Sequence, residues 1–102
     1  MNITDGQAID NGIVHIYGQY THHTDAFILG DEKGLLALKS AIVTALTSPN
    51  KKGIVDVFCN DGEGYTICIK VVEDTNILPV PYEAYYAQDK VGTDPGDIFN
   101  KD

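Results

Sequence analysis

The sequence predicts an α+β domain of two layers, in which a four-stranded, mostly antiparallel sheet carries one main helix in the order ββαββ. Two observations predict this class: β-branched and aromatic residues gather in four short runs, and one longer segment has helical apolar spacing. The 102 residues, 43% of them apolar, suffice for one modest core. We expect a single domain over residues 1–102, with a flexible start at 1–11 and a proline-containing C-terminal arm at 77–102.

The first two strands are expected to form a hairpin. Residues 12–20 read Gly-Ile-Val-His-Ile-Tyr-Gly-Gln-Tyr, a run rich in strand-favouring side chains. Thr21 to Thr24 then form the turn, and residues 25–30 return as the second strand.

The main helix is expected over Glu32 to Ser48. Asp31 precedes it as an N-cap, and Ser48-Pro49-Asn50 ends it. Apolar residues at positions 35, 38, 42, 45 and 46 form one stripe, which is predicted to face the sheet.

Residues 54–59 and 65–72 are expected to form a second hairpin around Asn60-Asp61-Gly62-Glu63-Gly64. Asp-Gly favours a tight turn because glycine adopts positive φ without strain. The fourth strand alternates, with Tyr65, Ile67, Ile69 and Val71 on one side. Cys59 and Cys68 are expected to face each other across this hairpin as reduced thiols.

The C-terminal arm contains Pro79 and Pro81, which exclude a central strand and favour an extended segment. One or two helical turns are expected within residues 82–90, and Ile98 and Phe99 are the apolar anchors of the last segment. One helix covers only part of one sheet face. We therefore expect the arm, a second copy of the chain, or both to cover the rest, and a homo-oligomer is predicted.

The charge restricts the partners. The chain has 15 acidic residues, 7 lysines and no arginine, and a net charge of −8. Binding to a nucleic acid polymer requires a basic face and is not expected. A bound anion would be held by backbone amides, hydroxyls, histidines or lysine. Neither a signal peptide nor a membrane-spanning run is seen, which predicts a cytoplasmic protein without a membrane partner.

His22 and His23, flanked by Thr21 and Thr24, raise three alternatives. Adjacent residues of a strand point to opposite faces, which disfavours a shared metal ion, with Asp25 the only carboxylate nearby. A solvent-exposed turn is the commonest explanation. The third alternative is an imidazole that donates to an anionic ligand, with help from the threonine hydroxyls.

Other motifs favour structural explanations. Residues 30–34 resemble a phosphate loop in shape, but helix capping by Asp31 explains them better. Residues 61–65 are too short for a calcium loop and fit a hairpin turn. Ser40 and Ser48 have no histidine spaced to activate them. We expect no catalytic residue, no metal, no cofactor and no enzymatic activity.

Several short motifs carry a resemblance to small phage and bacterial proteins, a group that includes phage anti-defence "sponge" proteins. The motifs are Gly18-Gln19-Tyr20, Asp25-Ala26-Phe27-Ile28 with Gly30, Gly34-Leu35 with Leu38, Asp61-Gly62-Glu63-Gly64-Tyr65, and Leu78-Pro79-Val80-Pro81-Tyr82. The resemblance implies an oligomer that sequesters nucleotide immune signals such as cyclic dinucleotides or cyclic ADP-ribose isomers. It provides no site motif, and the absence of arginine departs from the usual chemistry of phosphate binding.

The predicted function is non-enzymatic capture of a small anionic nucleotide in pockets of a homo-oligomer, within the host cytoplasm if the chain is phage-encoded. Aromatic rings would line the pocket, hydroxyls and imidazoles would reach phosphate or ribose oxygens, and one lysine would supply counter-charge. The alternative is an acidic immunity protein that neutralises a basic toxin or another protein partner. The candidate residues are Tyr20, Thr21, His22, His23, Thr24, Tyr65, Lys70 and Tyr82. Tyr82, Tyr85 and Tyr86 fit core or interface anchors as well as ligand stacking.

Overall fold

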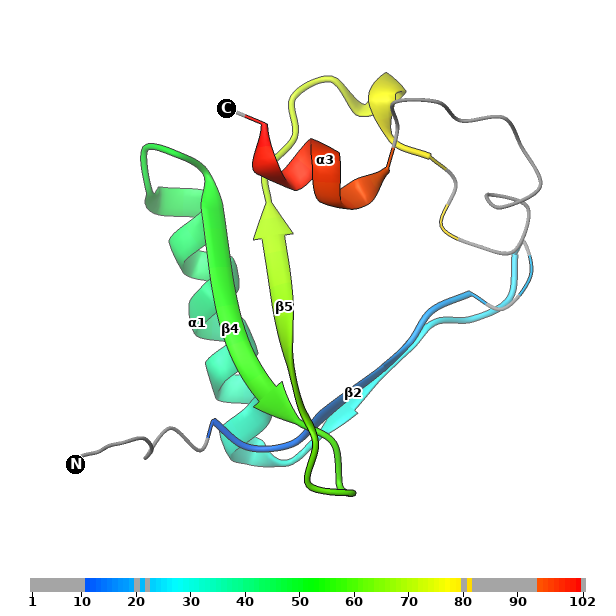
Figure 1. The fold of residues 1–102 in the computed structure, drawn as a ribbon, viewed down its shortest axis with the longest axis vertical. Helices are drawn as coiled ribbons and strands as arrows, with labels where there is room; N and C mark the ends of the chain where they lie inside the picture. Colours follow the sequence, from blue (N-terminus) through cyan, green and yellow to red (C-terminus); the bar gives the residue numbers. More distant parts are fainter. Residues whose placement is uncertain (1–10, 20, 22, 80, 82–93, 102) are drawn as a thin grey trace.

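Four strands, one main helix and two short helices make up the described part of the chain, residues 11–19, 21, 23–79, 81 and 94–101 of a computed structural model (Figure 1). The predicted α+β class is confirmed. In chain order the elements are β2 (Val14–Tyr17), β3 (Phe27–Gly30), α1 (Glu32–Thr47), β4 (Lys52–Phe58), β5 (Gly64–Lys70), the 3-10 helix η1 (Thr75–Ile77) and α3 (Pro95–Asn100).

The four strands form two antiparallel two-stranded sheets, where the sequence predicted one sheet of four. β2 pairs with β3, and β4 pairs with β5. A single parallel bridge between Ile13 and Phe58 joins them, and the Phe58 N–H donates to the Gly12 carbonyl at 3.0 Å. Beyond this bridge the β2–β3 hairpin diverges and projects away from α1 and β4 (Figure 1). The sheet is divided because only the start of the first strand lies beside β4.

α1 begins where its capping signal predicted. The Asp31 carboxylate accepts hydrogen bonds from the backbone N–H groups of Gly34, at 2.7 Å, and Ile13, at 3.1 Å. These two bonds lower the pKa of Asp31 below its usual value, because both favour the charged form. At the other end the Ser48 N–H donates to the Thr44 carbonyl at 2.8 Å. Asp31 therefore caps the helix and also fixes the entry of the chain into β2.

The buried face of α1 is narrower than the predicted stripe. Its buried residues are Gly34, Leu38, Ala41 and Ala45. Leu35, Ile42 and Leu46 of the predicted stripe are exposed, so that part of the prediction is wrong. The reason is the close approach of β4, since a Cβ added at Gly53 would overlap the Ala41 carbonyl oxygen. Only small residues fit where the backbones of α1 and β4 come this close, as at Ala41, and Leu38 is the one large side chain of the buried face.

One core lies between α1 and the inner face of β4 and β5. Val14 and Val57 are fully buried at its centre, and the half-buried Tyr65, Ile67 and Ile69 of β5 pack against it. The predicted alternation of the fourth strand is thus correct over β5.

The outer face of β4 and β5 is covered at one end by α3, an element that was not predicted. Ile98 of α3 is buried, and the Lys52 ammonium lies over the Phe99 ring, 5.2 Å from its centroid. The two predicted anchors, Ile98 and Phe99, therefore both lie in α3 and attach the C-terminal segment to β4 and β5. Figure 1 shows α3 beside the end of β5. Leu78 is extended after η1, whereas the helical turns expected within residues 82–90 lie outside the described residues.

The two cysteines do not face each other, contrary to expectation. Cys68 pairs with Ile54 in the β4–β5 ladder, and the Cys59 N–H donates to the Glu63 carbonyl at 2.8 Å, beyond the end of β4. Both thiols are free. Within the described residues, no helix combines the length and the apolar character needed to cross a membrane.

Candidate functional site

The predicted polar turn lies at the far end of the β2–β3 hairpin. The Thr24 hydroxyl donates to the Thr21 carbonyl at 2.7 Å and accepts from the Thr21 N–H at 3.3 Å. His23 has a φ of 67°, a left-handed conformation typical of a tight turn. Tyr20 and His22 lie outside the described residues. Because the Thr24 hydroxyl makes both of these hydrogen bonds within the turn, its main role is to stabilise the turn.

Tyr65 lies at the base of the same hairpin, with its ring directed to the core. Its hydroxyl donates to the Val14 carbonyl at 2.5 Å. Burial raises the pKa of Tyr65, because the apolar surroundings disfavour the phenolate, and the nearby Cys59 and Tyr17 act in the same direction. The structure therefore gives Tyr65 a packing role that links β5 to β2.

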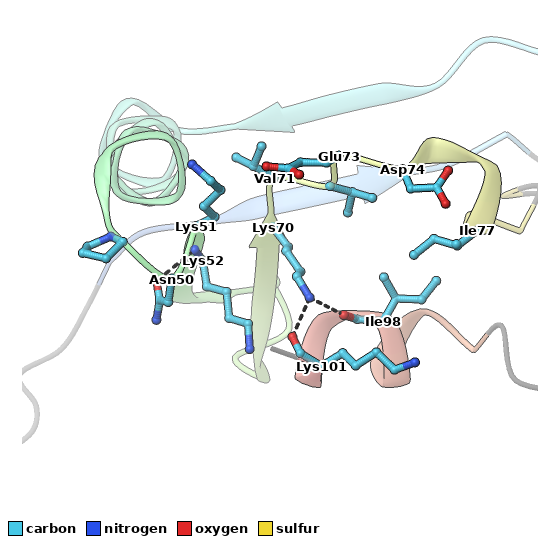
Figure 2. Close-up of a pocket in the computed structure, with 12 residues that line it drawn as sticks. Asn50, Lys51, Lys52, Lys70, Val71, Glu73, Asp74, Ile77, Ile98 and Lys101 are labelled. Atoms are coloured by element: carbon cyan, nitrogen blue, oxygen red, sulfur yellow. Dashed lines mark hydrogen bonds between the residues drawn. The ribbon is translucent and has the colours of Figure 1, made fainter.

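Lys70 lies at the end of β5 opposite to Tyr65, and its side chain holds α3 by hydrogen bonds. Its ammonium donates to the backbone carbonyls of Ile98 and Lys101, each at 2.6 Å (Figure 2). These carbonyls lie at the C-terminal end of α3, where a cation is favourable. Two of the three ammonium protons are thus used within the protein.

The structure does not bring these candidates together. β2 alone carries the chain about 10 Å from Val14 to Tyr17, and Thr21 lies beyond its end. Tyr65 and Lys70 are five residues apart on one strand, about 16 Å at the usual rise per residue. Tyr82 lies outside the described residues. One small ligand in a single copy of the chain would not reach the turn, Tyr65 and Lys70 at once.

A different site emerges around Lys70: an open cleft of about 530 Å³ that we call the lysine cleft. It lies between the α1–β4 loop, the end of β5, the segment leading to η1, and α3 (Figure 2). Its lining residues are Pro49, Asn50, Lys51, Lys52, Lys70, Val71, Val72, Glu73, Asp74, Ile77, Ile98 and Lys101.

The electrostatic character of the lysine cleft is opposite to that of the chain. Four of the seven lysines line it, against two carboxylates, although the whole chain carries a net charge of −8. Lys52 and Lys70 point toward α3, and Lys51 points the other way (Figure 2). The cleft is therefore a local positive region in which Lys52 and Lys70 are the central charges.

The loop before β4 positions these lysines. The Asn50 side-chain oxygen accepts from the Ser48 hydroxyl at 2.7 Å and from the Lys52 N–H at 3.1 Å. Lys51 has a φ of 60°, which allows the sharp reversal from helix to strand. The Val71 N–H then donates to the Lys51 carbonyl at 3.0 Å, which continues the ladder past Lys52 and Lys70.

The lysine pair across this ladder is a site that the sequence analysis missed, although a signal was available. The tight Asp61-Gly62 turn fixes the register of the hairpin, and that register places Lys52 opposite Lys70. Like charges directly opposite each other are destabilising unless other groups neutralise them. Here the backbone carbonyls of Ile98 and Lys101 stabilise the Lys70 charge by accepting its hydrogen bonds, and the Phe99 ring faces Lys52.

Metal binding has no support among the residues that the structure describes, since no group of three histidines, cysteines or carboxylates is placed to hold an ion. The cleft supplies ammonium groups, backbone polar groups and the apolar surfaces of Val71, Ile77 and Ile98. This combination suits an anionic ligand with an apolar or aromatic part.

Comparison with known proteins adds no relative. No protein-family model matches the chain, and neither the curated proteins nor the solved structures contain a match. The case for a function therefore depends on the lysine cleft.

Proposed function

We propose that the protein is a non-enzymatic binding protein that captures a small anionic ligand of the nucleotide class in the lysine cleft. The observation that carries the proposal is the gathering of four of the seven lysines around one cleft in a strongly acidic chain. The resemblance to sponge proteins suggests sequestration of a nucleotide immune signal as the biological role. Capture without turnover is sufficient for such a role.

The size and lining of the cleft support this ligand class. Its volume of about 530 Å³ lies within the range of about 300–1,000 Å³ that small-molecule sites occupy. Lys52 lines the cleft and would supply positive charge to a phosphate, while Ile77 and Ile98 would offer apolar surface to a base. A nucleotide combines both features in one molecule.

The charges predict how binding depends on salt. The surrounding protein is acidic and repels anions at long range, whereas the cleft attracts them at short range. Lysine acts as a point charge and provides no bidentate fork. Affinity is therefore expected to fall steeply as ionic strength rises, because an open cleft is screened by salt.

The test is calorimetric titration of the full chain with cyclic dinucleotides, ADP-ribose isomers and inorganic diphosphate, followed by heat release and chromatography of the ligand. Binding with recovery of intact nucleotide supports the proposal. The variant Lys52→Met is expected to lose at least about tenfold in affinity, since it removes a charge at the ligand. Lys39→Met is the matched control, because this exposed lysine on α1 does not line the cleft and its variant should bind as the unmodified chain does.

Two results would contradict the proposal. The first is failure of every ligand in the panel to bind at low salt. The second is recovery of a cleaved ligand, which would indicate an enzyme.

The net charge of −8 favours one second candidate, an acidic protein that neutralises a basic toxin or another basic partner. Salt-sensitive association with a basic protein, unchanged by Lys52→Met, would favour this alternative over nucleotide capture.

A further inference from the structure

The β2–β3 hairpin exposes apolar side chains on both of its faces. Ile16 pairs with Ile28, and Tyr17 pairs with Phe27 one position along, so the two pairs lie on opposite faces. Phe27 and Ile28 are each 53% exposed, and Leu29 is 58% exposed. All four residues of β3 are exposed, which is unusual for a strand of this composition.

A hairpin of this kind gains little stability alone. Two-stranded hairpins are marginal in water unless another layer covers one face. Among the described strands β3 pairs only with β2, which leaves its outer edge open. Burial of an aromatic side chain removes about 150–250 Å² from water, and an aliphatic one removes somewhat less. The half-exposed Ile16, Tyr17, Phe27, Ile28 and Leu29 therefore present on the order of 500 Å² over the two faces of the hairpin. The total over both faces is comparable with the largest apolar patch of a typical monomer, about 300–600 Å².

We infer that a second copy of the chain covers the β2–β3 hairpin in a two-fold symmetric dimer, with hairpin packed on hairpin. Because the exposed side chains lie on both faces, the two hairpins must clasp each other so that both faces are covered. Burial of about 500 Å² from each copy then gives about 1,000 Å² in total, the lower bound for a specific interface. Two-fold pairing brings the same apolar patch onto itself, and two-fold dimers are the commonest oligomers.

The charge distribution selects a second copy over other occupants. Residues 13–30 contain one residue with a full charge, Asp25, together with the three histidines of the chain, which the net charge counts as neutral. Two copies that each carry a net charge of −8 can meet here with little repulsion. A basic protein partner is attracted by clustered acidic residues, and an anionic membrane is attracted by lysines; the hairpin segment has one carboxylate and no lysine.

The dimer surface and the lysine cleft share no residue. Loss of one is therefore expected to leave the other in place, and the two proposals can fail separately. Each dimer would present two lysine clefts.

Sedimentation velocity of the full chain tests the inference. We expect a dimer at micromolar concentration, and we expect Ile28→Glu to raise its dissociation constant at least about a hundredfold, since a buried unpaired carboxylate is costly. Ile54→Glu is the matched control, because Ile54 is an equally exposed strand isoleucine on β4, outside the hairpin. This variant should remain a dimer. A monomeric unmodified chain, or an Ile28→Glu variant that still dimerises, would overturn the inference.

Hydrogen exchange provides a measurement that needs no variant and stays valid if Ile28→Glu fails to fold. The amides of residues 27–30 should exchange more slowly in the dimer and faster after about hundredfold dilution. The amides of β4 should not respond to dilution. Exchange at residues 27–30 that is independent of concentration would overturn the inference.

Discussion

The phenol of Tyr65 donates a hydrogen bond of 2.5 Å to the backbone carbonyl of Val14, and this bond ties β5 to β2 across the junction of the two sheets. Val14 is fully buried. The neighbouring Ile13 carbonyl faces the β3 side and accepts from the Asp31 N–H at 3.1 Å, so the Val14 carbonyl points the other way. Without Tyr65 a buried acceptor would lose its partner.

Replacement of Tyr65 by phenylalanine is therefore expected to destabilise the fold. The ring remains in the core, but the Val14 carbonyl is left unsatisfied, which costs about 1–3 kcal/mol. Urea denaturation followed by far-UV circular dichroism measures the loss. Tyr17→Phe is the control, because the Tyr17 hydroxyl bonds the His15 ring at 2.7 Å on an exposed surface. Equal losses in the two variants would argue against a special role for the Val14 bond.

The stability of the protein is expected to fall at high pH through Tyr65. Burial raises the pKa of this phenol above 10.0, so the unfolded chain ionises first as pH rises. The contribution is complete below pH 10 and is lost as pH rises through the pKa of the folded state. The difference in unfolding free energy between the unmodified chain and Tyr65→Phe should thus shrink above about pH 10. A constant difference across this range would contradict the assignment.

Asp31 is expected to make the fold sensitive to acid. The N–H groups of Gly34 and then Ile13 lower its pKa below 3.8, so the folded state holds the carboxylate charged when the unfolded chain protonates. The resulting stability is present above pH 3.8 and disappears as pH falls through the lowered value. Asp31→Asn retains a capping oxygen and removes the charge, so its stability should change less between neutral and acidic pH. Thermal melts at a series of pH values provide the comparison, and parallel acid curves would exclude this role.

The contact between α1 and β4 should tolerate no side chain at Gly53. A methyl group there would overlap the Ala41 carbonyl oxygen, which belongs to a rigid helix backbone. Gly53→Ala is expected to lower the free energy of unfolding by at least about 2 kcal/mol. Gly18→Ala is the matched control, because a Cβ at Gly18 meets no atom within 4 Å. If both variants melt at the same temperature, the close packing of α1 on β4 is wrong.

Local chemistry accounts for the elements that the sequence predicted well. Asp31 caps α1, and Gly62 has the positive φ, 90°, that its Asp-Gly turn requires. Such signals act within a few residues, so they do not depend on the rest of the fold. α3 carries a signal of the same kind that was not used: the Asp94 side chain accepts from the Gly96 N–H at 3.0 Å, and Pro95 occupies the first turn.

Apolar spacing alone was insufficient for the buried face of α1. Leu35, Ile42 and Leu46 have the correct period, yet small residues at 34, 41 and 45 take the core positions beside Leu38. The distance between helix and strand decides which residues fit, and that distance depends on glycine at position 53 of another element. A pattern within one segment contains no information about its neighbour.

The sequence by itself determined the class of the fold, the start of the main helix and the two hairpins, because the capping and turn signals behind them act between residues near in the chain. Only the tertiary structure decided that a single bridge joins the two hairpins and that α3 packs beside Lys70. These contacts bring four lysines to the lining of one cleft. These features join residues as far apart as Ile13 and Phe58, or Lys70 and Lys101. Their free energy comes from burial and hydrogen bonds that exist only once the distant segments have met.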